Sequence, residues 1–211
     1  MERINLVVPY TDKEKVKALG ARWDGVLRVW FVPRDVDPDR FDQWIMRPPA
    51  INLRAPNGFH LARTGAFCWK CREPFWVYAL YFERQPVFIE RRDMVAGELQ
   101  EIYSHDQYGS GFASFVEYIN PEAEVLIRAI APSYRFDVSA KGKTAYFMNH
   151  CTACGMKQGD FELFNEPEAA FHPLSEAHVN AIQRRHIPVW LEAAHATYHS
   201  CEAVAGNTAR F

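Results

Sequence analysis

The sequence of 211 residues contains no apolar run that approaches the roughly 20 residues needed to cross a lipid bilayer. Its first residues also lack a basic stretch followed by a long apolar one, so we expect no secretory signal and a cytoplasmic protein. An excess of charge of one sign is missing as well, because the formal net charge is -2. The whole surface is therefore not a polycation, and any nucleic-acid binding must use a local patch.

Familiar catalytic motifs are also missing from the chain. We find no Gly-rich phosphate-binding loop, no nucleophile elbow and no pairing of carboxylates that suggests two-metal catalysis. An enzyme remains open, since catalytic groups often come from distant positions. Hydrophobic residues make up 48% of the chain and aromatic residues 14%, which is enough for real cores and excludes wholesale disorder.

Four of the five cysteines form two Cys-x-x-Cys pairs, Cys68/Cys71 and Cys151/Cys154. Each pair can bend into a turn, or knuckle, that presents both sulfurs to one metal ion, and Gly155 suits such a turn because it tolerates positive φ. Two knuckles complete the four-thiolate shell that zinc favours, with no position left open for chemistry. The sequence therefore predicts one structural Zn²⁺, although about 80 residues separate the pairs, far more than in a simple zinc ribbon.

Other interpretations of these cysteines and of the histidines stay open. The pairs suit unrelated buried thiols, two redox pairs or an iron–sulfur cluster as well, and we expect Cys201 to be a free thiol. His150 precedes a candidate ligand and is a candidate to hydrogen-bond near a zinc thiolate. His195 and His199 have the i, i+4 spacing of helical metal ligands, but surface or capping roles fit them better.

The order of patterns along the chain predicts two domains and an α+β fold. Residues 1–47 form a small αβ module, Arg47-Pro48-Pro49 a linker, and residues 51–211 a larger zinc-ribbon-like domain with helical additions. In the module we expect strands near residues 4–8, 22–24 and 29–32, and a helix with a Thr11/Glu14 capping box that ends at Gly20.

In the larger domain the patterns predict both strands and helices. We expect residues 75–82 and 87–89 to pair as a hairpin, residues 97–115 to form a loop, and residues 145–148 to form a strand. Helices are expected over residues 121–130, 175–183 and 188–194, the first with Asn120 as its N-cap. The tail from Ala203 to Phe211 looks frayed.

Basic and aromatic residues alternate in the first domain between Tyr10 and Pro33. Basic side chains can meet phosphates while aromatic rings stack on bases, so Lys13, Lys17, Arg22 and Arg28 are candidate nucleic-acid contacts. Acidic residues lie among them and leave the module almost neutral. A solvated helix face beside a small tryptophan core is the plainer interpretation.

Three strings in the same module carry a family resemblance: residues 8–10, 17–24 (KALGARWD) and 29–33 (VWFVP). They resemble a small bacterial domain of unknown function that recurs in plasmid primases of the TraC type and in other conjugation or DNA-processing proteins. The resemblance covers about the first 45 residues and implies a DNA-associated context. Where the family commonly has Lys before the second Trp, this chain has Val29. The second domain is similar to zinc-binding regions of uncharacterised bacterial proteins around residues 149–151 and 154–161.

Together these observations predict a zinc-stabilised, non-enzymatic accessory protein associated with DNA in plasmid or phage processes. DNA or RNA would be the partner of the N-terminal module. One alternative is a protein–protein adaptor or inhibitor that uses the zinc domain as a platform. The other is a nuclease-like enzyme with an unrecognised site.

Overall fold

The computed structural model describes residues 4–25, 29–45, 50–83, 87–95, 98–104, 109–139, 144–194 and 197–211. The chain divides into two compact units: unit 1 comprises Met1–Pro48 with Asp137–Ala145, and unit 2 comprises Pro49–Phe136 with Tyr146–Phe211. The expected linker at residues 47–49 lies outside the described residues. The assignment of residues 1–47 and 51–211 as separate folding domains stays a prediction.

Unit 1 is built on a three-stranded antiparallel sheet in the order β1-β3-β2 (Ile4–Leu6, Val29–Val32 and Arg22–Asp24). A 3₁₀ turn, η1 (Tyr10–Asp12), leads into helix α1 (Lys13–Ala18), and a second one, η2 (Pro38–Phe41), follows the sheet. Its core contains Leu6, Val16, Val32, Phe41 and Trp44. Together with the partly buried Ile4, Val8, Leu19 and Trp30, these residues recur with the strand and helix periods, which is why the short elements fold together.

The start of α1 differs from the expected capping box. Asp12 precedes the helix, and no side chain caps it. The Asp12 carboxylate instead accepts a hydrogen bond from the Trp44 indole N–H (3.2 Å) and pairs with Lys15 (2.9 Å). The end of the helix is as expected, because Gly20 has a φ of 104°, a conformation that favours glycine.

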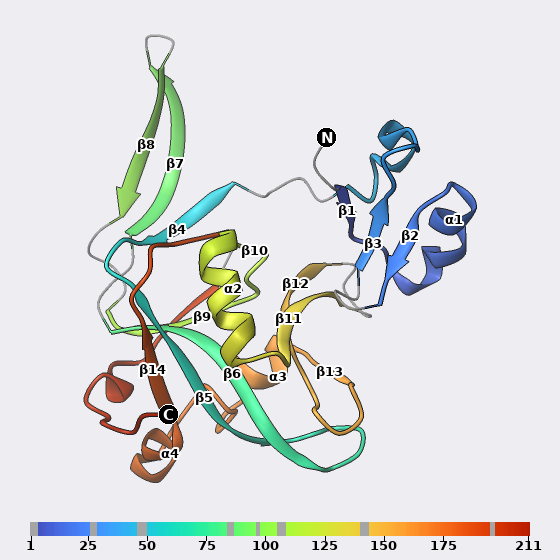
Figure 1. Ribbon diagram of the computed structural model, residues 1–211. Helices are drawn as coiled ribbons and strands as arrows, with labels where there is room; N and C mark the ends of the chain where they lie inside the picture. Colours follow the sequence, from blue (N-terminus) through green and yellow to red (C-terminus); the bar gives the residue numbers. More distant parts are fainter. Residues whose placement is uncertain are drawn as a thin grey trace. The chain divides into compact units, whose positions relative to one another are not determined.

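Unit 2 contains most of the strands, arranged in two five-stranded sheets of order β10-β15-β4-β7-β8 and β14-β5-β6-β9-β16, with β11-β12-β13 as a three-stranded sheet (Figure 1). Their bounds are β4 Ile51–Ala55, β5 Phe59–Phe67, β6 Pro74–Phe82, β7 Val87–Val95, β8 Glu98–Ser104, β9 Gly111–Ser114, β10 Tyr118–Ile119, β11 Tyr134–Val138, β12 Ala145–His150, β13 Lys157–Gln158, β14 Gln183–Ile187, β15 Leu191–Ala194 and β16 Thr197–Ser200. The helices are α2 Pro121–Ile130, α3 Asp160–Phe164, α4 Glu176–Ala181 and the 3₁₀ turn η3 Glu202–Val204.

Strands β5 and β6 are buried on both faces along much of their length. Leu61, Tyr78 and Leu80 belong to one core, which α2 covers with Ala123 and Ile127. The residues between them, such as Ala62 and Ala79, belong to a second core, completed by Phe112, Phe164 and Phe171. Cys68 and Cys151 are part of this second core, which places both Cys pairs at its edge.

The expectation of an α+β fold with helical additions is wrong, because the described part of the chain is mostly β, with four antiparallel sheets and few short helices. Residues 191–194, expected in a helix, form β15 between β10 and β4. Leu191, Ala193 and Ala194 are fully buried there, so sheet pairing and burial outweigh the helix propensity of alanine. The region expected as a loop, residues 97–115, contains β8 and β9.

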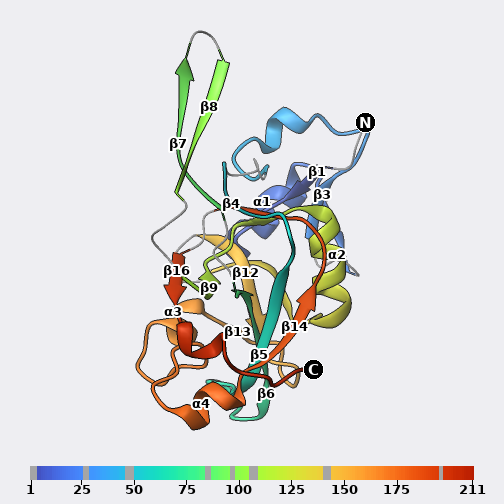
Figure 2. The ribbon, with the colours of Figure 1, turned by 90° about the vertical axis from the view of Figure 1, so that its left-hand side faces the viewer.

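Two further expectations for unit 2 are corrected. Strand β7 pairs with β4 and β8 rather than with β6. The C-terminal tail is held in place, because the Arg184 backbone N–H donates to the Ala209 carbonyl (3.0 Å), and the buried Asn207 side chain donates to the carbonyls of Val179 and Ile182 (2.7 and 2.6 Å). Figure 2 shows the C-terminus beside β14. Within the described residues, no helix is long and apolar enough to span a membrane.

Candidate metal centre

Each Cys pair lies in the turn of an antiparallel hairpin, the first between β5 and β6 and the second between β12 and β13. The two turns have the same backbone hydrogen bonds. Cys68 N–H donates to the Glu73 carbonyl (3.0 Å) and Arg72 N–H to the Cys68 carbonyl (2.9 Å). Cys151 N–H donates to the Met156 carbonyl (2.9 Å) and Gly155 N–H to the Cys151 carbonyl (2.9 Å). The local spacing therefore folds both pairs into equivalent knuckles.

The folding of the hairpins brings the four sulfurs together, although about 80 residues separate the pairs. All four Sγ atoms lie within 4.8 Å of one another. The Cys68 and Cys154 sulfurs are 3.7 Å apart, and the Cys71 and Cys151 sulfurs are 3.6 Å apart. A tetrahedral Zn²⁺ with sulfurs at about 2.3 Å requires sulfur–sulfur separations of about 3.8 Å. The donor set and its spacing thus fit a four-coordinate, thiophilic metal ion.

The electrostatics of the cluster also favour a cation. Burial alone would raise the pKa of the Cys68 thiol, but N–H groups of Cys71 and Lys70 and the adjacent thiols outweigh it and lower the pKa to about 6. At Cys71 the Glu73 N–H favours the thiolate, yet burial and the three neighbouring sulfurs raise the pKa to about 12. Four thiolates at this separation repel one another, so full ionisation requires a bound cation.

Gln158 connects the two knuckles, a role that the sequence analysis missed. Its buried amide donates to the Cys68 sulfur (3.5 Å) and to the Met156 carbonyl (3.0 Å), and it accepts from the Trp69 backbone N–H (3.4 Å). The Trp69 indole N–H donates to the Lys157 carbonyl (2.8 Å). The position of Gln158, four residues after Cys154 and within a two-residue strand, is the only signal of this role in the sequence.

Of the three histidines singled out from the sequence, two have hydrogen bonds to oxygen atoms and the third cannot be placed. The His150 ring nitrogen Nδ1 bonds to the carbonyls of Ser133 (3.1 Å) and Met148 (3.0 Å). His199 Nε2 bonds to the Ser114 hydroxyl (2.8 Å), and its ring stacks on Phe164, while His195 lies outside the described residues. Cys201 lies between β16 and η3; it is partly buried, and burial raises its pKa.

The candidate nucleic-acid residues belong to unit 1. Lys13 and Lys17 are on α1, and Arg22 is an exposed residue of β2. The Lys13 ammonium group donates to the Tyr10 hydroxyl (2.9 Å) and lies 4.1 Å from the centre of that ring. Arg28 lies outside the described residues. The structure therefore places three of the four residues on exposed elements of unit 1, with Lys13 partly covered by its contact with Tyr10.

Comparison with known proteins finds relatives of the N-terminal region. Residues 3–46 match a family described as a domain of unknown function, DUF5710. Two Escherichia coli proteins, both named DNA primase TraC, are similar: one is 56% identical over 43 residues, 20% of this chain and 4% of the primase. The other is 44% identical over 43 residues, 20% of this chain and 3% of the primase. The aligned region is thus a small part of each primase.

The remainder of the chain has no comparable match. No family match supports the expected similarity of the second domain to zinc-ribbon-like proteins. No solved structure matches the chain. The comparisons therefore connect residues 3–46, and not the cysteine cluster, to plasmid primases.

Proposed function

We propose that this chain is a zinc-stabilised accessory protein of plasmid or phage DNA processing, and that it acts by binding rather than by catalysis. The observation that carries the proposal is the 56% identity of 43 residues to a protein named DNA primase TraC. A region shared at this level between otherwise different proteins is typical of a module that brings a common binding property to each. We take that property to be contact with DNA.

The four cysteines would hold one structural Zn²⁺. A four-thiolate shell leaves no open coordination position, so the ion would supply folding free energy and fix the β5–β6 hairpin against the β12–β13 hairpin. Away from the sulfurs the two hairpins are joined by the Asn149 side chain, which exchanges two hydrogen bonds with the Tyr78 backbone (2.7 and 2.9 Å), and at the knuckles by Gln158 and Trp69. The metal would therefore fix the knuckle ends of the hairpins at the edge of the second core.

The N-terminal contact would use Lys13, Lys17, Arg22 and Arg28. Lys13 and Lys17 are at i, i+4 on α1 and so share one face of the helix. Two aromatic rings are exposed in the same unit: Tyr10 is 81% exposed and Trp23 is 51% exposed. Cations beside exposed rings suit phosphates and bases respectively.

The test is fluorescence anisotropy of labelled single- and double-stranded oligonucleotides, titrated with zinc-loaded protein from about 50 mM salt upward. We expect binding that weakens with salt, and a salt slope whose magnitude falls by about 1.5–2 in Lys13→Glu/Arg22→Glu, because two phosphate contacts are lost. The matched control is Arg34→Glu/Arg40→Glu, which makes the same charge change at exposed residues of unit 1. Equal binding by wild type and Lys13→Glu/Arg22→Glu refutes the N-terminal contact, and no binding at all favours the protein–protein adaptor.

A further inference from the structure

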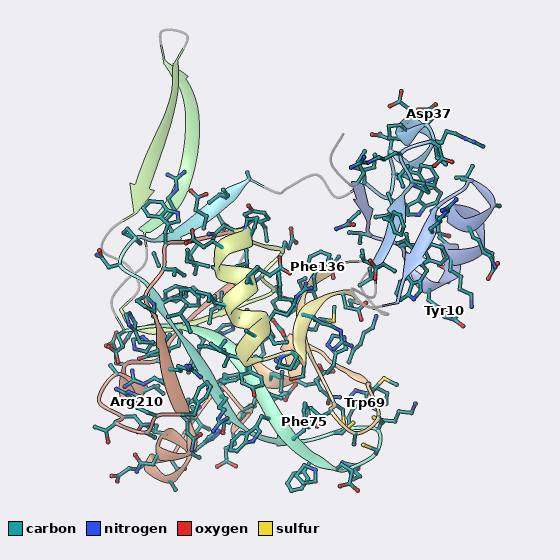
Figure 3. The ribbon with its side chains drawn as sticks, in the orientation of Figure 1. Tyr10, Asp37, Trp69, Phe75, Phe136 and Arg210 are labelled. Atoms are coloured by element: carbon teal, nitrogen blue, oxygen red, sulfur yellow. The ribbon has the colours of Figure 1, made fainter. Side chains whose placement is uncertain are left out.

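The hairpin that carries the first Cys pair presents aromatic rings to solvent. Phe67 is 72% exposed, Trp69 60% and Trp76 43%. Large aromatic side chains are usually well buried, so three exposed rings within ten consecutive residues mark this hairpin as a candidate contact region. Figure 3 shows Trp69 next to the sulfur atoms at the end of this hairpin.

The strand register places two of these rings on the same face. Phe67 lies opposite Pro74, Gly65 opposite Trp76, and Arg63 opposite Tyr78. Opposed residues share a face of an antiparallel pair, and so do residues two apart along a strand. Arg63, Phe67 and Trp76 therefore project from one face. The glycine opposite Trp76 leaves that face open, because a Cβ atom at Gly65 would meet nothing within 4 Å.

One cationic group lies over the Trp76 ring, and two more are exposed in the adjoining knuckle. The Arg63 guanidinium lies 4.5 Å from the centre of the Trp76 ring and 4.1 Å from that of Phe211. Lys70 and Arg72 are exposed in the knuckle between the strands, and Glu73 is the one acidic residue between positions 63 and 76. The hairpin thus combines two exposed rings, one of them partly covered by Arg63, with exposed Lys70 and Arg72 in the adjoining knuckle. This composition suits an anionic polymer with flat bases.

We propose that this surface, Arg63, Phe67, Lys70, Arg72 and Trp76, binds single-stranded DNA. Unpaired bases stack on Trp76 and Phe67, and the guanidinium and ammonium groups contact phosphates. The bases of a duplex are paired with the other strand and stacked on their neighbours, so they cannot reach these rings unless the duplex opens. The surface therefore selects single strands. The inference deepens the proposed function and rests on it, since the choice of DNA comes from that function and the stacking surface from the structure.

Oligonucleotide binding by the zinc-loaded full chain tests the proposal. With labelled oligo(dT) as probe, Trp76→Ala and Phe67→Ala should each weaken binding about tenfold, the loss of one base–aromatic stack. Trp76→Phe keeps an aromatic ring and should retain most of the affinity. The matched control is Trp190→Ala, because Trp190 is 45% exposed but follows the strand end at Ile187, which pairs with Phe59 at the far end of β5. That control should bind like wild type.

A second readout does not depend on the alanine variants folding normally. Addition of oligo(dT) should quench tryptophan fluorescence in the wild type, and Trp76→Phe should lose part of that quenching. Equal zinc content and circular dichroism confirm that each variant compared is folded. Wild-type affinity and undiminished quenching in the Trp76 and Phe67 variants overturn the inference.

The outcomes separate this inference from the proposed function. Loss of DNA binding in Lys13→Glu/Arg22→Glu, with unchanged binding in Trp76→Ala and Phe67→Ala, supports the proposed function and refutes DNA binding by this surface. Absence of DNA binding by the wild type refutes both the proposed function and this inference. Duplex DNA that binds as tightly as oligo(dT), or oligo(U) that binds about tenfold tighter, overturns the assignment to single-stranded DNA.

Discussion

Arg72 and Gly155 occupy the same position in the two knuckles, four residues after Cys68 and Cys151, and both have positive φ, 65° and 71°. In each turn the residue at this position donates its N–H to the carbonyl of the first cysteine. A glycine adopts this conformation without strain, whereas a side chain costs free energy there. The first knuckle therefore tolerates a strain that the second avoids.

The difference between the two positions predicts a loss of stability at Gly155 and almost none at Arg72. Gly155→Val should lower the free energy of unfolding by about 1–2 kcal/mol through its backbone conformation, since a Cβ at Gly155 meets nothing within 4 Å. Arg72→Gly should stay within about 0.5 kcal/mol of wild type, because relieved strain offsets the added freedom of the unfolded chain. Urea unfolding of zinc-loaded protein measures both. Gly206→Ala, at an open glycine without positive φ, is the control. Equal losses of unfolding free energy for Gly155→Val and Gly206→Ala would mean that the positive φ of Gly155 imposes no cost on a side chain, which contradicts the equivalence of the knuckles.

Removal of the Gln158 amide should weaken the metal centre. Gln158→Leu leaves the Trp69 N–H and the Met156 carbonyl without this partner and removes a donor to the Cys68 sulfur. We expect a loss of stability of about 1–3 kcal/mol and zinc affinity reduced about 10–100-fold. Competition with a chromogenic chelator measures the affinity, with Thr152→Ala, an exposed residue of the second knuckle, as control. Unchanged affinity in Gln158→Leu means that the amide only fills space.

Asp160 predicts a pH dependence of stability. Its buried carboxyl accepts from the Phe115 N–H (2.7 Å), and its Oδ1 has no hydrogen-bond partner within the described part of the chain. Burial, with a smaller contribution from Glu162, outweighs that N–H and raises the pKa of Asp160 to about 7. The unfolded chain has a pKa of about 3.9, so the folded state binds the extra proton between these values, and stability falls as pH rises towards 7.

Asp160→Asn should abolish this contribution. The variant should gain about 1 kcal/mol relative to wild type between pH 6 and pH 8, because the neutral amide resembles the protonated acid at every pH. Urea unfolding of zinc-loaded proteins across this range measures the difference. Glu166→Gln, at an exposed carboxylate, should follow the wild-type curve. Parallel curves for Asp160→Asn and wild type would show that Asp160 is ionised throughout.

Limited proteolysis tests whether residues 1–47 and residues 51–211 fold as separate domains. Among the described residues, the core of unit 1 is built from residues between Ile4 and Ile45, so a cut after them should leave that core intact. We expect brief digestion to cleave first near Arg47–Pro49 or between Ser104 and Gly111, before either core is cut. Mass spectrometry identifies the fragments. Initial cleavage inside α1 or β6 contradicts two independently folded domains.

Local features of the sequence predicted more than long-range ones did. The Cys-x-x-Cys spacing and Gly155 predict a knuckle because the turn is determined within six residues, and the structure brings the two pairs together. The helix expected over residues 188–194 was wrong. Trp190, Leu191 and Ala194 fit a helical spacing, but the conformation there is set by pairing of β15 with β4, more than 130 residues earlier. Gln158 was missed for the same reason, since its partners in the first knuckle are about 90 residues away. Sheet pairing between distant segments has no periodic signal in either segment alone.

The metal content of freshly purified protein tests the central claim most directly. Elemental analysis should give one zinc per chain, and X-ray absorption should show four sulfur neighbours at about 2.3 Å. Cys151→Ser should lose the metal and unfold unit 2, since metal binding and folding are coupled. Protein that folds without zinc or another thiophilic metal, or that holds stoichiometric iron or two disulfides at these cysteines, would contradict the account.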